Sequence, residues 1–197
     1  MPVSTSAKRL PKDDRRAQLL GIALEIVREE GTDALTLARL ADQAGVSKPI
    51  AYTHFTTRSG LLAALYEHLD RMQTDALKQA LMLSPRRLED IARVIATAYV
   101  ECHRKVGPEF GAIAAALKGD PDMDAFHQKL LDQCLAILAK ALGPFAPVSG
   151  KALRLRCVAM NGACEALARD ESTAKMPVSA AVGVLTATIV ALASAKA

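Results

Sequence analysis

The side chains best suited to chemistry gather in one stretch, Thr36–Phe55, and their types suit binding rather than bond breaking. As a helix, the second half of this stretch would expose one face: Lys48, Pro49, Ile50, Tyr52, Thr53 and His54. The lysine can donate to guanine edges or phosphates, and the proline and isoleucine can pack on a thymine methyl group. The tyrosine and histidine can reach the phosphate backbone, which sets register. The pattern therefore predicts a surface that contacts double-stranded DNA.

Such a surface needs two short helices that pack at a steep angle, and the same stretch contains residues suited to each part of that arrangement. Thr36 and Ser47 can cap the first and second helix, and a helix N-terminus presents free N–H groups that suit a phosphate. Ala41 is small enough for the close inner contact, and Gly45 can adopt the positive φ that the turn requires. We therefore predict a helix-turn-helix over residues 36–55.

The rest of the chain must form a scaffold that holds this motif, and its composition favours helices throughout. Apolar residues make up 51% of the 197 residues, while aromatic residues make up only 4%. Runs with apolar residues at spacings of three and four are separated by glycine and proline, which is typical of a helical bundle. We predict an all-α chain of about nine helices, near residues 14–30, 36–44, 48–53, 57–82, 85–105, 109–118, 122–142, 150–170 and 178–195.

Charge and cysteine content add little to this interpretation. The formal net charge is +4, which is compatible with a polyanionic partner but too small to indicate one. The four cysteines, Cys102, Cys134, Cys157 and Cys164, form no C-x-x-C pair and are interpreted as buried free thiols. The polar start of the chain has no apolar signal segment, and the apolar stretch 178–195 suits an interface helix better than a membrane anchor. We therefore expect a cytoplasmic protein.

Residues 36–55 resemble the TetR family of bacterial repressors. The segments Leu40–Ser47 and Tyr52–Phe55 match the family pattern Ile-Ala-x-x-Ala-Gly-Val-Ser-x-Gly-x-Leu-Tyr-x-His-Phe closely, and the resemblance extends over about residues 14–70. Pro49 stands where glycine is common, and Ala51 stands where a larger apolar residue is common. These two departures alter the second helix of the motif, which is the recognition helix, so the base preference of the family cannot be assigned to this chain.

The family pattern continues with Ser-Lys-Glu at the start of the fourth helix, where this chain has Thr57-Arg58-Ser59. Thr57 can still cap that helix, and Arg58 can still donate to a phosphate. Arg58 therefore joins Thr36, Ser47 and the six residues of the exposed face in the predicted DNA-binding set. The acidic residue that would favour the helix start is missing.

The resemblance also implies a domain organisation and a mechanism. It implies an N-terminal arm over residues 1–13, a DNA-binding domain over 14–58, and a ligand-binding and dimerisation domain over 59–197. A homodimer formed through the last two helices would place two recognition helices roughly 34–36 Å apart on a palindromic operator. A small apolar effector would release the repressor, in a pocket lined by Tyr99, Cys102, His103, Phe110, Ile113, Phe126 and Leu130. No cofactor or metal is implied.

Three other functions compete with that of an effector-released DNA-binding regulator. A redox sensor on the same fold would use a cysteine pair as its switch. A helical adaptor would keep the fold without binding DNA, although Ser47, Lys48, Tyr52 and Arg58 argue against that. An enzyme is disfavoured, because no glycine-rich phosphate loop, metal cluster or Ser-His-Asp arrangement is evident.

Overall fold

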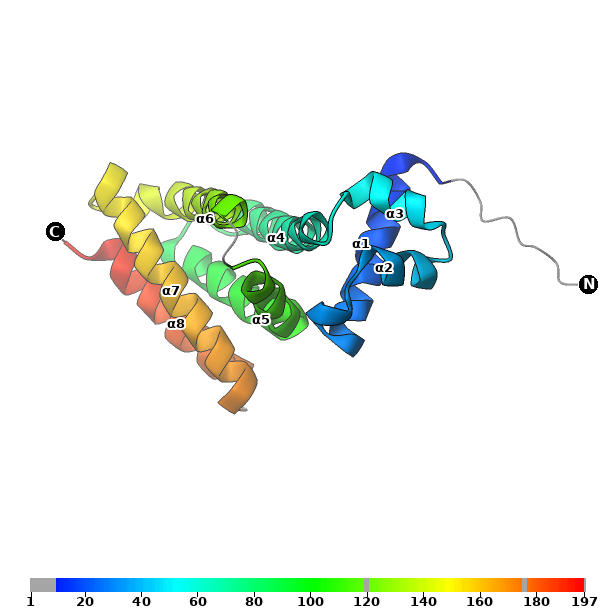
Figure 1. Ribbon diagram of the computed structural model, residues 1–197. Helices are drawn as coiled ribbons and strands as arrows, with labels where there is room; N and C mark the ends of the chain where they lie inside the picture. Colours follow the sequence, from blue (N-terminus) through cyan, green and yellow to red (C-terminus); the bar gives the residue numbers. More distant parts are fainter. Residues whose placement is uncertain (1–9, 119–120, 175–176, 197) are drawn as a thin grey trace, which may run out of the picture. The chain divides into compact units, whose positions relative to one another are not determined.

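The computed structural model describes residues 10–118, 121–174 and 177–196, and within these ranges every regular element is a helix (Figure 1). The α-helices are α1 (Lys12–Glu30), α2 (Leu37–Ala44), α3 (Lys48–Phe55), α4 (Arg58–Leu83), α5 (Leu88–Ala116), α6 (Pro121–Leu142), α7 (Gly150–Ala174) and α8 (Val178–Ser194). Two 3-10 turns, η1 (Thr32–Ala34) and η2 (Gly143–Phe145), follow α1 and α6. The all-α prediction is confirmed. Residues 1–9 of the predicted arm lie outside the described residues.

The predicted break at Gly107–Pro108 was wrong, because α5 runs through both residues as one helix. Proline removes one backbone N–H and crowds the preceding turn, which bends a helix without necessarily ending it. Gly107 fits this position closely, since a Cβ there would lie 2.8 Å from the ring of His103. The two helices expected over 85–118 are therefore one, and the described residues contain eight α-helices.

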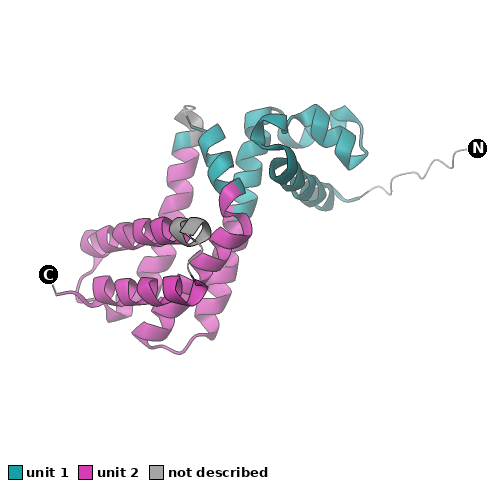
Figure 2. Ribbon diagram, turned by 90° about the horizontal axis from the view of Figure 1, so that it is seen from below, with its two compact units in different colours: residues 1–69, 109–124 teal, residues 70–108, 125–197 magenta. Residues whose placement is uncertain are grey.

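The chain divides into two compact units (Figure 2). The first contains Met1–Leu69 and Glu109–Asp124, and the second contains Asp70–Pro108 and Ala125–Ala197. The sequence prediction divided the chain at residue 58, whereas the structural division falls within α4 and adds the end of α5 to the first unit. Helix α4 thus begins in one unit and ends in the other.

In the first unit, the core is built on the apolar stripe of α1. Leu19, Ala23 and Ile26 are fully enclosed, as their spacing of three and four along the helix predicts. Leu40 of α2 and Phe55 of α3 are buried as well. The two short helices α2 and α3 therefore share one core with α1, and this core holds the helix-turn-helix in place.

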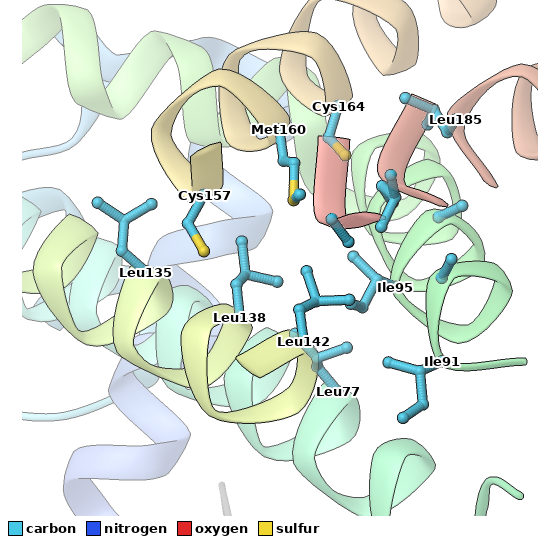
Figure 3. Packing of buried hydrophobic residues seen from close by; sticks show 14 of the residues in the cluster. Leu77, Ile91, Ile95, Leu135, Leu138, Leu142, Cys157, Met160, Cys164 and Leu185 are labelled. Atoms are coloured by element: carbon cyan, nitrogen blue, oxygen red, sulfur yellow. The ribbon is translucent and has the colours of Figure 1, made fainter. Parts of the chain in front are cut away.

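The core of the second unit draws on five helices (Figure 3). Cys157, Met160 and Cys164 of α7 are buried among leucines and isoleucines of α4, α5, α6 and α8. The cysteines act here as small apolar residues, which is their usual role inside proteins. The α7 and α8 helices pack against each other along their lengths.

In the described part of the chain, no single helix is both long and apolar enough to cross a membrane. One bent pair of helices, Asp124–Phe145 with Gly150–Ala168, is long and apolar enough by length and composition only.

Candidate nucleic-acid interface

The turn between α2 and α3 is made by Gly45, as predicted. This glycine adopts φ 64° and ψ 31°, in the left-handed region. Its N–H donates to the carbonyl of Asp42 over 3.3 Å, and the N–H of Val46 donates to that of Ala41 over 3.0 Å. This pair of bonds is a Schellman motif, which ends a helix and redirects the chain. Ala41 is fully buried, so the two helices meet closely at this point.

The start of α2 is capped by Thr36. Its Oγ1 accepts a hydrogen bond from the N–H of Arg39 over 3.1 Å, as expected for an N-cap threonine. The side chain of Arg39 also pairs with Glu30 at the end of α1. This hydrogen bond lowers the pKa of Glu30 and raises that of Arg39. Thr36 is exposed, so its position remains open to a ligand.

Ser47 occupies the N-cap position of α3, but its side chain makes no capping hydrogen bond, and that part of the prediction was wrong. The second residue of the helix is Pro49, which has no N–H to donate. The N–H of the third, Ile50, already donates to the carbonyl of Ser47 over 2.9 Å. The exposed Ser47 hydroxyl thus stands at the start of α3 without an internal role as a cap.

The outward face of α3 matches the sequence prediction. Lys48, Pro49 and Thr53 are exposed, and the side chains of Ile50 and Tyr52 are 36% and 52% exposed. The opposite face is buried: Ala51 and Phe55. The hydroxyl of Thr53 donates to the carbonyl of Pro49 over 2.7 Å, which fixes its orientation along the helix. Large apolar and aromatic side chains left exposed on a short helix indicate a contact surface.

His54 lies half-buried at the end of this face. Arg16 of α1 donates to its backbone carbonyl over 2.8 Å, and the same guanidinium lies 4.9 Å from the centre of the Phe55 ring. The His54 Nδ1 atom is enclosed and has no hydrogen-bond partner among the described residues. Burial lowers the pKa of His54, and the positive charges of Arg16, Lys12 and Arg15 lower it further, while Asp13 opposes them. His54 is therefore biased toward its neutral form.

The joint between α3 and α4 is unusually tight. Thr56 adopts φ 62° and ψ −55°, a conformation that β-branched residues rarely take. The N–H of Thr57 donates to the carbonyl of Phe55 over 2.6 Å, which closes a γ-turn around Thr56. Thr57 Oγ1 accepts from the N–H of Gly60 over 3.0 Å, so Thr57 caps α4 as predicted. A Cβ on Gly60 would lie 2.4 Å from the carbonyl oxygen of Phe55.

Arg58 is exposed, and its guanidinium is nevertheless engaged with the protein. Its Nε donates to the carbonyl of Leu35 over 3.0 Å, and its Nη2 donates to the carbonyl of Thr32 over 2.7 Å. The carboxylate of Asp33 lies 3.6 Å from the same Nη2. The sequence analysis interpreted Arg58 as a phosphate contact, and the structure places its guanidinium on the backbone between α1 and α2.

The first unit also has relatives among known proteins. Residues 19–65 match the family of bacterial regulatory proteins called the tetR family. The transcriptional activator FasR of Mycolicibacterium smegmatis is 45% identical over 74 residues, which are 37% of this chain and 33% of that protein. The class C tetracycline repressor protein of Escherichia coli is 40% identical over 53 residues, which are 27% of this chain and 24% of that protein.

Over nearly its whole length, the fold is that of a solved TetR-family transcriptional regulator from Streptomyces coelicolor. The TM-score is 0.70 at 19% identity, with 91% of this chain and 79% of that one covered. The match to the tetR family covers residues 19–65, which include the helix-turn-helix. The sequence matches to the two curated relatives span a third or less of their length.

The residues predicted to line an effector pocket are divided between the two units. Phe110 and Ile113 lie in the first unit, where Phe110 packs on the ring of Tyr66 with centroids 4.2 Å apart. The other five lie in the second unit: Tyr99, Cys102, His103, Phe126 and Leu130. Ile113 and Leu130 are buried core residues. Their role as pocket residues stays a prediction.

A buried polar network that the sequence analysis missed surrounds one of these residues. The hydroxyl of Tyr99 donates to Asn161 Oδ1 and lies 3.4 Å from the sulfur of Cys134. Asn161 Nδ2 in turn donates to Glu165 over 2.9 Å. The signal available in the sequence was the position of Asn161, a polar residue beside the apolar stripe of Leu153, Cys157 and Cys164. Burial raises the pKa of Tyr99 well above its usual range, so the phenol stays protonated.

The cysteines are poorly suited to a redox switch. Burial raises the pKa of Cys102 to about 11 and that of Cys164 to about 12, and it raises those of Cys134 and Cys157 as well. The thiolate is the reactive form, and it is scarce at neutral pH when the pKa is this high. Among the described residues, no group of three or more His, Cys, Asp or Glu side chains is placed to hold a metal ion.

The tight joint predicts that Gly60→Ala will destabilise the chain. The added Cβ would press against a backbone oxygen, so we expect the free energy of unfolding to fall by about 1–3 kcal/mol despite the better helix propensity of alanine. Urea unfolding measures this. The matched control is Gly21→Ala in α1, where a Cβ meets nothing within 4 Å and stability should rise by up to about 1 kcal/mol. Equal effects of the two substitutions would show that the close approach at Gly60 has no energetic consequence.

The lowered pKa of His54 predicts a pH dependence of stability. A histidine with a folded pKa below its unfolded value near 6.5 binds fewer protons when folded, so stability falls as the pH drops from neutrality through this value. His54→Gln should therefore reduce the loss of melting temperature on acidification. The measurement is the melting temperature of the wild type and of His54→Gln at several pH values below neutrality. If the variant loses stability on acidification as the wild type does, His54 does not carry the proton linkage.

Proposed function

We propose that this chain is a sequence-specific DNA-binding transcriptional regulator that reads operator DNA with α3. The observation that carries the proposal is the exposed face of Lys48, Ile50 and Tyr52, held outward by the left-handed turn at Gly45. A helix of this length fits the major groove of B-DNA. The match to a family of bacterial regulatory proteins supports the same function. A regulator of this kind would act in the cytoplasm.

Each exposed residue of α3 has a role that follows from its chemistry. Lys48 and the free hydroxyl of Ser47 stand at the helix N-terminus, where a phosphate or a guanine edge is bound most favourably. Pro49 and Ile50 present apolar surface that suits a thymine methyl group. Tyr52 would donate to the phosphate backbone. Thr36 would add a second phosphate contact at the start of α2.

We infer that the functional form is a homodimer joined through α7 and α8. Both helices leave apolar residues exposed, with Leu155 69%, Val158 45% and Val184 51% exposed. Small residues lie exposed on the same helices: Ala159, Gly162, Ala166, Ala180, Gly183, Ala187 and Ala191. Small side chains let helices of two subunits approach closely, and a two-fold dimer would match a palindromic operator.

The second unit would sense a small apolar effector that releases the regulator from DNA. Its interior is almost entirely apolar, and the Tyr99–Asn161 pair supplies polar groups that could orient such a ligand. Release requires that the effector bind the released form more tightly than the DNA-bound form. Repression is proposed as the output, although one relative is named an activator and another a repressor. The raised pKa values of the four thiols favour ligand sensing over the cysteine-based redox alternative.

The recognition face can be tested with the double variant Lys48→Ala/Tyr52→Ala. Each DNA contact contributes about 1–3 kcal/mol, so we expect at least a tenfold loss of affinity at fixed salt. The probe is a duplex that the wild-type chain selects from a random-sequence pool, and affinity is measured by fluorescence anisotropy. Lys151→Ala, at an exposed lysine of the second unit, is the control and should bind as the wild type does. Unchanged affinity in a folded double variant would refute the proposed role of α3.

The dimer interface can be tested with Val184→Glu. A carboxylate in the centre of the exposed α8 face would be buried without a partner on dimerisation, which is strongly unfavourable. We expect sedimentation velocity to show a monomer whose helical content is unchanged. Leu83→Glu places the same charge on a side chain that is 88% exposed at the end of α4 and should leave the dimer intact. A dimeric Val184→Glu would place the interface elsewhere.

A further inference from the structure

We propose that Arg58 is a positioning residue, whose guanidinium ties the first turn of α4 to the backbone that leads into α2. The two carbonyls that it binds belong to Thr32 and Leu35. Leu35 directly precedes Thr36, the N-cap of α2, and its side chain is fully buried. The two hydrogen bonds of Arg58 therefore hold the backbone that determines where α2 begins.

The geometry suits arginine and not lysine. The planar guanidinium carries donors in a fixed fork, so its Nε and Nη2 can reach two carbonyls at once, at 3.0 and 2.7 Å. A lysine ammonium at the same position is a single point donor. Asp33, whose carboxylate lies 3.6 Å from Nη2, offsets part of the positive charge that a phosphate would otherwise attract.

The other end of the tie is fixed as well. Thr57 caps α4 by accepting a hydrogen bond from the N–H of Gly60, and Gly60 lies against the carbonyl of Phe55 at the end of α3. The backbone of Arg58 is thus held at the α3–α4 joint while its side chain reaches the α1–α2 connection. One residue links the end of the recognition helix to the start of the helix that supports it.

Helix α4 gives this link a regulatory consequence, which rests on the proposed function. It runs without interruption from Arg58 in the first unit to Leu83 in the second. A displacement of α4 that follows effector binding would pull on Thr32 and Leu35 through Arg58. The start of α2 would then shift together with α3, and the DNA-contact surface would lose its geometry.

The test compares Arg58→Lys and Arg58→Gln with the wild type on the selected duplex over a range of salt concentrations. A positioning role predicts that both variants lose affinity by roughly tenfold, because neither can hold two carbonyls, and that the salt slope stays unchanged. A phosphate contact predicts near wild-type binding by Arg58→Lys and a slope reduced by about 0.9 in Arg58→Gln. That second result would overturn the proposal. Arg71→Lys, at an exposed arginine on the same helix, is the control.

Amide hydrogen exchange separates this inference from the proposed function. If Arg58 holds the backbone, both variants should exchange faster than the wild type over residues 32–44 in the absence of DNA, while α8 exchanges at its wild-type rate. Unchanged exchange over residues 32–44 would overturn the positioning role, whatever the binding data show. If the wild-type chain selects no DNA sequence, the proposed function fails, and the exchange experiment still decides whether Arg58 acts as a tie.

Discussion

The left-handed backbone at Gly45 is the constraint on which the proposed DNA-binding surface depends. Because the N–H groups of Gly45 and Val46 both turn back onto α2, the chain leaves that helix in one direction only. That direction buries Ala51 and Phe55 and leaves Lys48, Ile50 and Tyr52 outside. A side chain at position 45 would have to adopt a φ of 64°, which most residues avoid. One backbone conformation thus separates the core face of α3 from its contact face.

The turn at Gly45 orients α3 but does not hold it, and two arginines add hydrogen bonds that hold α3 and the start of α2. Arg16 of α1 donates to the carbonyl of His54 in the last turn of α3, where a cation also interacts favourably with the helix C-terminus. Arg58 of α4 binds the backbone that leads into α2. Both cations lie beside the proposed DNA-contact surface, yet both are directed to protein carbonyls. Counting basic residues near the motif would therefore overestimate the number of phosphate contacts.

The parts of the site that sequence predicted correctly are those that depend on neighbouring residues. The turn at Gly45 and the caps at Thr36 and Thr57 follow from local rules and were found. Ser47 does not cap α3 through its side chain, because Pro49 has no N–H and the N–H of Ile50 donates to the Ser47 carbonyl instead. The prediction overlooked this local effect. The hydrogen bonds of Arg58 were not predicted for a different reason: its partners lie more than twenty residues earlier in the chain, and no spacing rule reveals them. The continuation of α5 through Pro108 likewise depends on tertiary packing rather than on helix propensity.

The same distinction bears on the extent of the family match, which covers residues 19–65. A surface that fits a DNA groove needs particular residues at fixed places, and the matched residues include the helix-turn-helix. A helical core needs only apolar residues of suitable total volume, and many combinations satisfy that requirement. A chain of this fold can therefore share its architecture at 19% identity over 91% of its length. The proposed effector would then be selected by the few polar groups of the second unit, and the hydrogen-bonded Tyr99, Asn161 and Glu165 are where this unit departs from a purely apolar interior.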